Sequence, residues 1–136
     1  MSRKPKAKAL PPSKFVVPSE VGITFSFQYH DSKHELFTLR GMDIEYVYDV
    51  LERFKNLSGF TSGRLVGNGS RALRCHPIRW EDTTQRGFGD IEKERYEGCA
   101  YQIEISQSKG RVHGFFIGSV FHVVWFDPNH KLYSKR

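Results

Sequence analysis

The chain has 136 residues, 14% of them aromatic, and this length is enough for one globular domain with a moderate hydrophobic core. The formal net charge is +6 at pH 7, and no run of about 18 apolar residues occurs, so the sequence predicts no membrane-spanning helix. The N-terminal stretch MSRKPKAKALPPSKF lacks the apolar segment of a secretory signal, so we expect a cytoplasmic protein.

The positive charge is concentrated at the N-terminus. Residues 1–19 hold five Lys or Arg side chains and no acid, whereas residues 20–136 hold 16 basic and 15 acidic side chains. A segment rich in Lys and Pro is typical of a disordered tail. We therefore divide the chain into a basic tail, 1–19, and a single domain, 20–136. The tail either contacts RNA or a ribosome or serves as a solubilising arm. The nucleic-acid contacts in the first case are Arg3, Lys4, Lys6 and Lys8.

The first half of the domain predicts two strands and one long helix. Apolar and polar residues alternate over 22–30, which is typical of a half-buried strand, and a short strand over 35–39 can pair with it. Asp43 is a suitable N-cap for a helix that runs to about Leu57. The apolar positions of this helix are spaced for one face: Ile44, Val47, Tyr48, Leu51 and Phe54.

The middle of the chain, 60–98, gives a weaker pattern. Residues 60–75 predict a loop with one strand near 71–75, and residues 76–80 predict an extended edge segment, because Pro77 cannot donate to a central ladder. Residues 81–98 are charged and contain glycine, so they form either an exposed loop or a short helix around 90–96. His76 and Arg79 are candidates for phosphate contacts, with a simple edge segment as the equal alternative.

The last third, 101–133, predicts three short strands in a meander. A Gly118-Ser119 turn sets Phe115 opposite His122, and the preceding loop, 107–110, sets Glu104 opposite His113. Because side chains alternate along a strand, one face then becomes apolar and packs on the helix. The other face stays open and carries seven residues: Gln102, Glu104, Arg111, His113, Phe115, His122 and Val124. The predicted class is α+β, a largely antiparallel sheet with one main helix on one face.

The residues on the predicted open face suit cleavage of RNA without metal. Such a reaction needs a base for the 2′-hydroxyl proton, an acid for the leaving 5′-oxygen and a cation on the phosphate. Glu104 and His113 can share the first two roles, and Arg111 or Arg79 can supply the third. The alternative is a cross-strand Glu–His pair on a wet sheet face, which stabilises by a few tenths of a kcal/mol.

Three further side chains are candidates with structural alternatives. His122 either contacts nucleic acid or is a packed histidine among apolar neighbours. His130 and Tyr133 follow the turn at 127–129 and either act beside the sheet, as an acid–base group and a stacking ring, or dock the C-terminus. The two cysteines, Cys75 and Cys99, are expected to be reduced, and no Cys or His spacing matches a structural zinc site.

The order of elements over 43–133, with its Glu, Arg, His and Tyr residues, resembles the RelE-type bacterial toxins, small basic mRNA interferases. The resemblance implies a twisted antiparallel sheet whose concave face holds a metal-free active site. The matching positions are Glu104, Arg111, His113, His130 and Tyr133, the last two near the C-terminus as in the YoeB-like branch. The chain departs from this family in its greater length, its first strand, its insertion over 59–98 and its nearly neutral core. The terminal VWFDPNHKLY is also similar to the end of a group of short uncharacterised bacterial proteins.

We therefore expect a metal-independent endoribonuclease, a hydrolase of the RelE-like toxin type that acts on mRNA and needs no cofactor. Its expected partners are RNA or a ribosome and a protein antitoxin. One alternative is a non-catalytic nucleic-acid-binding module, in which arginines hold phosphates while Phe115 and Tyr133 stack on bases. The other is a protein-interaction domain of a bacterial defence or toxin–antitoxin system, with the sheet face as its interface.

Overall fold

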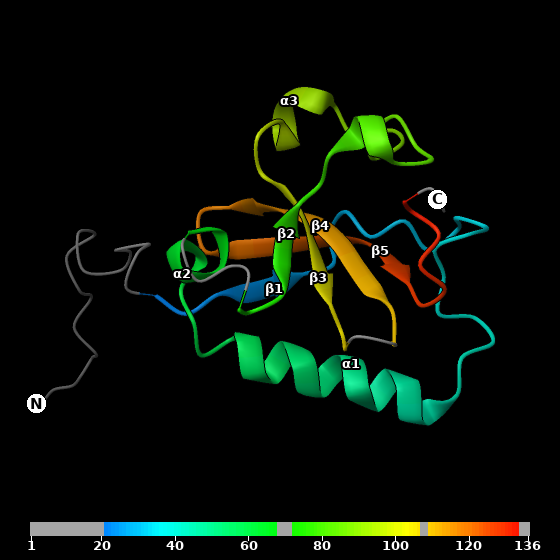
Figure 1. The fold of residues 1–136 in the computed structure, drawn as a ribbon, viewed down its shortest axis with the longest axis horizontal. Coiled ribbons are helices and arrows are strands. Elements are labelled where there is room, and N and C mark those ends of the chain that lie inside the picture. Colours follow the sequence, from blue (N-terminus) through cyan, green and yellow to red (C-terminus); the bar gives the residue numbers. More distant parts are fainter. Residues whose placement is uncertain (1–20, 68–71, 107–108, 134–136) are drawn as a thin grey trace, which may run out of the picture.

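A five-stranded sheet in the order β1-β5-β4-β3-β2 forms the centre of the computed structural model, which describes residues 21–67, 72–106 and 109–133 (Figure 1). The strands are β1 (Thr24–Ser26), β2 (Cys75–Pro77), β3 (Ala100–Glu104), β4 (Arg111–Ile117) and β5 (Val120–Asp127). The helices are α1 (Ile44–Leu57), α2 (Ser62–Val66) and α3 (Lys93–Tyr96), with a 3-10 turn, η3 (Trp80–Asp82). The predicted α+β class and the closing meander of β3, β4 and β5 are confirmed. The basic tail, with Arg3, Lys4, Lys6 and Lys8, lies outside the described residues.

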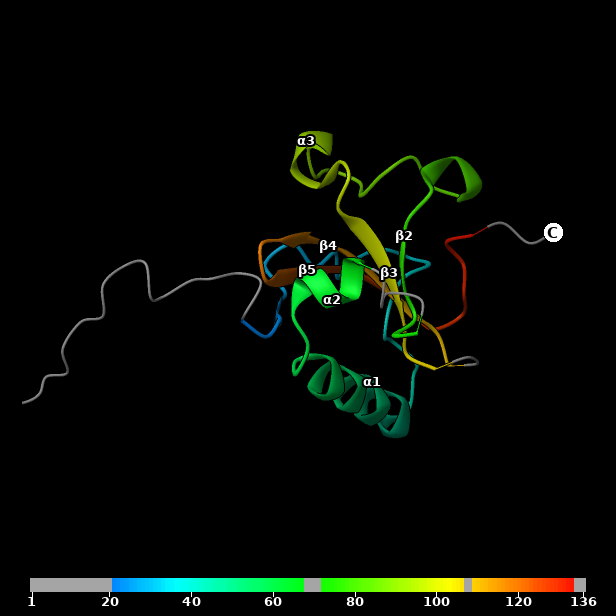
Figure 2. The same ribbon diagram turned by 60° about the vertical axis from the view of Figure 1, so that its left-hand side comes forward.

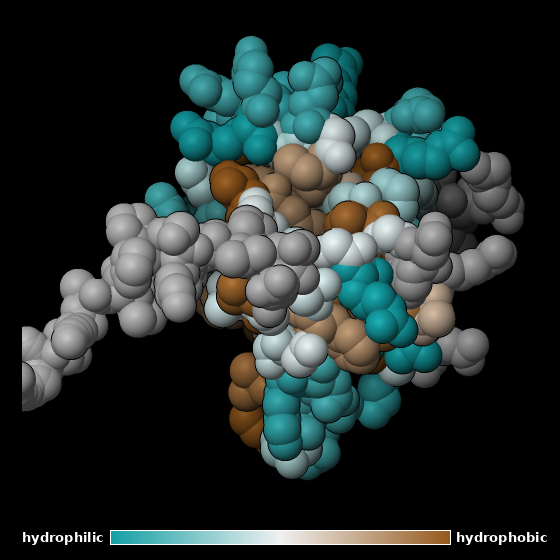
Figure 3. Space-filling model, turned by 90° about the vertical axis from the view of Figure 1, so that its left-hand side faces the viewer, coloured by the Kyte–Doolittle hydropathy of each residue, from teal (hydrophilic) through white to brown (hydrophobic). Residues whose placement is uncertain are grey.

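Helix α1 begins where the sequence predicts, because the Asp43 carboxylate accepts a hydrogen bond from the Tyr46 amide at 2.9 Å. The predicted buried face is wrong except at Phe54. The buried residues are Tyr46, Val50, Phe54 and Leu57. Ile44 is 75% exposed, and Tyr48 and Leu51 are each 58% exposed. The helix carries two apolar stripes, and Figure 3 shows hydrophobic residues on its outer side beside hydrophilic ones.

The predicted hairpin of 22–30 with 35–39 is wrong. Only Thr24–Ser26 is a strand, and it pairs in parallel with β5 at the edge of the sheet. The chain then turns back across β5, where the Asp31 amide donates to the Val124 carbonyl at 2.9 Å. Phe37 is fully buried and stacks on Trp125 with 4.5 Å between ring centroids. The segment 27–40 is therefore a cover for the sheet rather than a strand of it.

Both faces of the sheet are covered, so the expectation of an open face is wrong. Helices α1 and α2 contribute to the hydrophobic core on one face, where Phe54 stacks on Phe25 at 4.1 Å. A second core lies on the other face, below the segments 29–40 and 78–99: Phe37, Ile78, Phe88, Tyr96, Ala100, Phe115, Val124, Trp125 and Leu132. Figure 2 shows α1 below the sheet and the segment with α3 above it. Two of its aromatic residues, Phe37 and Phe88, come from loops, which show no periodicity in the sequence.

A β-bulge in β5 changes which side chains face the second core. Phe115 pairs with His122 as predicted, but His113 pairs with Trp125 while Gly114 pairs with Val123, so Val124 is an extra residue. Beyond this point the alternation of β5 is inverted, and Trp125 and Asp127 lie on the face of His113. The other hairpin also differs from the prediction, by two residues, and sets Glu104 opposite Arg111.

Gly114 lies at this bulge, and we expect Gly114→Ala to destabilise the fold. A Cβ at this position would collide with the His122 carbonyl oxygen and approach the Phe121 ring at 2.9 Å. Overpacking of this kind costs about 1–3 kcal/mol, which urea unfolding measures. Gly63→Ala is the matched control, because its Cβ would meet only the Thr61 hydroxyl at 3.9 Å. Equal stability of the two variants would contradict the close approach at the bulge.

Candidate functional site

His113, a residue of the predicted catalytic pair, is a fully buried side chain in the second core. Its exposed fraction is 0%, and its Nε2 lies 2.9 Å from Oδ2 of Asp127. Asp127 is 1% exposed and accepts further hydrogen bonds from the amides of Lys131, at 2.7 Å, and Leu132, at 3.0 Å. This pair holds the C-terminal segment on the sheet. The predicted pairing of His113 with Glu104 is wrong, and the enclosed ring has no contact surface for a substrate.

The electrostatics of this pair favour a neutral imidazole beside a carboxylate. Burial lowers the pKa of His113 below its ordinary 6.5, although the hydrogen bond and charge of Asp127 act in the opposite direction. Burial alone would raise the pKa of Asp127, but the hydrogen bonds from His113, Lys131 and Leu132 hold it below its ordinary value. The Nε2–H of a neutral His113 can donate to the carboxylate, and Nδ1 is then a buried acceptor without a hydrogen-bond partner.

Stability is expected to fall as the pH drops below about 6.5, because the folded-state pKa of His113 is depressed. The unfolded chain binds a proton there that the folded chain does not, and each such group contributes at most about 1.4 kcal/mol per pH unit. Burial also lowers the pKa values of His30 and His122, so they act in the same direction. Asp127 adds a loss at more acidic pH. Urea unfolding between about pH 7.5 and pH 5.5 measures the slope, and His113→Gln should reduce it. An unchanged slope in that variant would contradict the buried neutral state.

His122 is also packed rather than free to bind nucleic acid. It is 9% exposed, stacks on Phe115 at 5.2 Å and meets Tyr29 edge to face. These aromatic contacts agree with the second interpretation, a packed histidine among apolar neighbours. The structure therefore places His122 in a packed environment and not on an open sheet face.

The C-terminal candidates lie on a docked segment. His130 has φ 56 in the turn after β5, and its amide donates to the Asp127 carbonyl at 3.4 Å. The Tyr133 hydroxyl accepts a hydrogen bond from the Arg79 amide at 3.0 Å, and burial raises the pKa of Tyr133. Arg79 itself is exposed and lies 3.5 Å from both Glu81 and Asp82. Of the two interpretations of this segment, the one in which it docks the C-terminus on the sheet therefore agrees with the structure.

The structure brings Glu104 to a different histidine, His76, on the neighbouring edge strand. Strand β2 pairs antiparallel with β3, as predicted for an edge segment with Pro77, and sets His76 opposite Gln102. Nε2 of His76 lies 3.0 Å from Oε2 of Glu104. The imidazole side chain is 38% exposed and the carboxylate 16%, so the pair is half-buried and reachable from solvent. We call His76 and Glu104 the edge pair.

Three arginines adjoin Glu104 and make the cluster net positive: one approaches its carboxylate, one binds its main-chain carbonyl, and one pairs with it in the ladder. Nε of Arg74 lies 3.8 Å from Oε1 of Glu104. Nε of Arg53, from α1, donates to the Glu104 carbonyl at 2.8 Å, and its Nη2 donates to the Leu73 carbonyl. Arg111 lies opposite Glu104 in the ladder, and its Nη1 donates to the carbonyl of Ser106 at 3.1 Å. Burial, followed by the charge of Arg74, lowers the pKa of Arg53.

Arg74 has a strained backbone at this site. Its φ is 57, an unfavourable value for a side chain larger than glycine. Its carbonyl accepts a hydrogen bond from the Glu104 amide at 3.0 Å, which extends the β2–β3 pairing by one bond. Such conformations cost about 1–3 kcal/mol and occur preferentially at functional sites. The strain therefore supports the edge pair as a site with a function.

The sequence analysis identified several residues of this cluster as candidates, but it did not predict that they lie together. It marked Glu104 and Arg111 as catalytic and His76 as a phosphate contact, yet it gave His76 no partner. The missing information is the register of β2 on β3, because a strand of three residues carries no periodicity that predicts its pairing. Arg53, on the predicted helix, gave no signal apart from its charge.

The cluster contains no arrangement for a metal ion. Within the ranges that the structure describes, no three His, Cys, Asp or Glu side chains come together as a metal would require. In the same ranges, no helix is long and apolar enough to cross a bilayer. The two cysteines are free thiols, Cys75 buried and Cys99 half-buried.

Comparisons of the chain with family models, curated proteins and solved structures found no match.

Proposed function

We propose that this chain is a metal-independent endoribonuclease whose reacting groups are the edge pair. The observation that supports the proposal is the hydrogen bond from His76 to Glu104 at 3.0 Å within a half-exposed, net positive cluster. A carboxylate that holds one nitrogen of an imidazole fixes its tautomer and leaves the other nitrogen as a base. Arginine side chains recognise phosphate oxygens in the same setting.

The roles follow from the geometry of the cluster. Nε2–H of His76 donates to Glu104, and Nδ1 takes the proton of a ribose 2′-hydroxyl. The 2′-oxygen attacks the phosphorus, the bond to the 5′-oxygen breaks, and the leaving oxygen takes a proton from solvent. Arg74 and Arg111 stabilise the charge on the non-bridging oxygens. The products are a 2′,3′-cyclic phosphate and a free 5′-hydroxyl, with no net oxidation.

The position of the cluster favours an extended substrate. Strand β2 is an edge of the sheet, and the edge pair joins it to β3, with 38% of the His76 side chain and 16% of the Glu104 side chain exposed. A surface site at a sheet edge lets a chain enter and leave at both ends, which a single-stranded polymer requires. The net positive cluster attracts its phosphates in a salt-dependent way.

The proposal is tested with the purified chain and a fluorescent single-stranded RNA oligonucleotide in EDTA. We expect cleavage that yields 2′,3′-cyclic phosphate ends, identified by mass spectrometry. The same oligonucleotide with 2′-deoxy sugars should bind and stay intact, because it lacks the attacking oxygen. Cleavage of the deoxy strand, or cleavage only after a divalent metal is added, would contradict the proposed chemistry.

A non-catalytic RNA-binding module is the second candidate. The three guanidinium groups favour it, because phosphate contacts alone support salt-dependent binding. It differs from the first candidate in one result: RNA is bound and never cut. Arg74→Ala should weaken binding under both candidates, so turnover decides between them.

A further inference from the structure

We propose that a cavity at the end of β2 receives one nucleobase of the RNA and sets the preference for the base beside the cleaved bond. This inference rests on the proposed function of the edge pair. The cavity has a volume of about 290 Å³, just below the roughly 300–1,000 Å³ of small-molecule pockets. Six of its lining residues carry the argument: Ile78, Trp80, Lys93, Tyr96, Glu97 and Ala100.

The cavity lies one dinucleotide step from the edge pair. Ile78 continues the extended chain of β2, because its amide donates to the Ala100 carbonyl at 2.9 Å. Residues two apart on an extended chain share a face and lie about 6.6 Å apart. His76 and Ile78 therefore lie on one face of β2, one at the reacting centre and the other in the cavity wall. A phosphate at His76 places the neighbouring base at the cavity mouth.

The lining of the cavity offers both kinds of contact by which proteins recognise a base, stacking and hydrogen bonding. The apolar part, formed by Ile78, Ala100 and the rings of Trp80 and Tyr96, can take the flat faces of a heterocycle, and an indole is a good stacking surface. The polar part is one carboxylate, Glu97, and one ammonium, Lys93. A carboxylate accepts hydrogen bonds from base N–H groups, and an ammonium donates to base carbonyls or to a phosphate.

Backbone hydrogen bonds hold the walls of the cavity in place. The Trp80 carbonyl accepts from the Thr83 amide at 3.0 Å and from the Thr83 hydroxyl at 2.9 Å. On the other wall, the Tyr96 hydroxyl accepts from the Phe88 amide at 2.9 Å. Tyr133 anchors the start of the first wall through the Arg79 amide. A preformed pocket of this kind loses little entropy when it takes a ligand.

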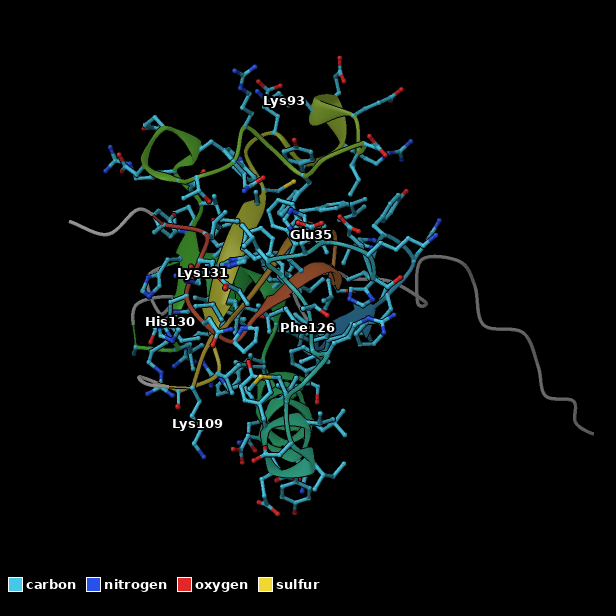
Figure 4. The ribbon with its side chains drawn as sticks, turned by 90° about the vertical axis from the view of Figure 1, so that its right-hand side faces the viewer. Glu35, Lys93, Lys109, Phe126, His130 and Lys131 are labelled. Atoms are coloured by element: carbon cyan, nitrogen blue, oxygen red, sulfur yellow. The ribbon has the colours of Figure 1, made fainter. Side chains whose placement is uncertain are left out.

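The polar groups at the rim are accessible. Lys93 and Glu97 are both exposed, and Figure 4 shows Lys93 at the end of the molecule that lies opposite Lys109. Glu94 is an equally exposed carboxylate on α3 that does not line the cavity. Glu94→Ala is a matched control, because it changes the net charge by the same amount as Glu97→Ala without altering the cavity lining.

The test uses the purified chain and mononucleotides, which contain no phosphodiester bond to cleave, so that binding alone is measured. Each of the four nucleoside 5′-monophosphates is added, and tryptophan fluorescence is recorded. The chain has two tryptophans, and Trp125 is 1% exposed, so the response should come from Trp80. We expect saturable quenching by at least one monophosphate, no quenching by ribose 5-phosphate, and loss of the signal in Trp80→Phe.

The rim variants test the recognition. Glu97→Ala should weaken binding of the preferred monophosphate about tenfold, which corresponds to 1.4 kcal/mol, whereas Glu94→Ala should leave it unchanged. Equal effects of both variants, or no saturable quenching by any monophosphate, would overturn the base pocket. Cleavage of RNA by the parent chain without monophosphate binding would reject the pocket alone. Monophosphate binding without any cleavage of RNA would reject the proposed ribonuclease and keep the pocket.

Discussion

Replacing Asp127 with alanine is expected to lower the free energy of unfolding by about 3–5 kcal/mol, because three hydrogen bonds to a buried carboxylate are lost, at about 1–3 kcal/mol each. The change leaves the His113 ring without its hydrogen bond and strands the amides of Lys131 and Leu132. Buried donors without acceptors lose their hydration with no compensation. The C-terminal segment should then detach from the sheet, which hydrogen exchange at Leu132 would detect.

A matched control for this variant is Asp49→Ala. Asp49 pairs with Lys109 at 2.8 Å, but more than half of the Lys109 side chain is exposed, and pairs of this kind contribute about 0–1 kcal/mol. Urea unfolding of both variants gives the comparison. A loss below about 1 kcal/mol in Asp127→Ala would contradict the role of the buried pair as the clamp of the C-terminus.

The His76→Ala variant is expected to cleave RNA between 10²-fold and 10⁴-fold more slowly, on the order of the contribution of a general base. The fold should survive this change, because the side chain is 38% exposed and lies on a short edge strand. Glu104→Gln should give a smaller loss, because the amide can still contact the ring but no longer stabilises an imidazolium. The rate of cleavage at saturating RNA measures both effects.

His30→Gln provides the control for a histidine outside the cluster. His30 is half-buried, meets Phe126 edge to face, and lies on the segment that follows β1. Its replacement is expected to leave the rate within about twofold of the parent, because the group makes no contact with the edge pair. A His76→Ala variant that cuts as fast as His30→Gln would remove His76 from the mechanism.

The elements with strong local signals were predictable, and those fixed by long-range contacts were not. The cap at Asp43, the edge position of Pro77 and the pairing of Phe115 with His122 all follow from local chemistry. The parallel pairing of β1 with β5 joins residues 96 positions apart, such as Thr24 and Val120, and no local pattern indicates it. The prediction of the buried face of α1 was wrong because the helix carries two apolar stripes, and only tertiary contacts determine which one is buried.

The candidate site shows the same division. Glu104 and Arg111 were recognised by residue type and strand position, and they do lie in the cluster. His113 was misplaced by two effects: a bulge that brings Asp127 to its face, and loop aromatics such as Phe37 that cover the ring. A bulge has no sequence signature in a run of apolar residues, and loops without periodicity give no sign of which face they cover.

Binding of a non-cleavable RNA analogue, followed by NMR of the six imidazole rings, tests the central claim most directly. The analogue is a single-stranded oligonucleotide with a 2′-deoxy sugar at the cleaved position. The account predicts a saturable shift of the His76 signals that Glu104→Gln diminishes, while the His113 signals stay unchanged because the ring is enclosed. Unchanged His76 signals together with binding elsewhere on the chain would contradict it.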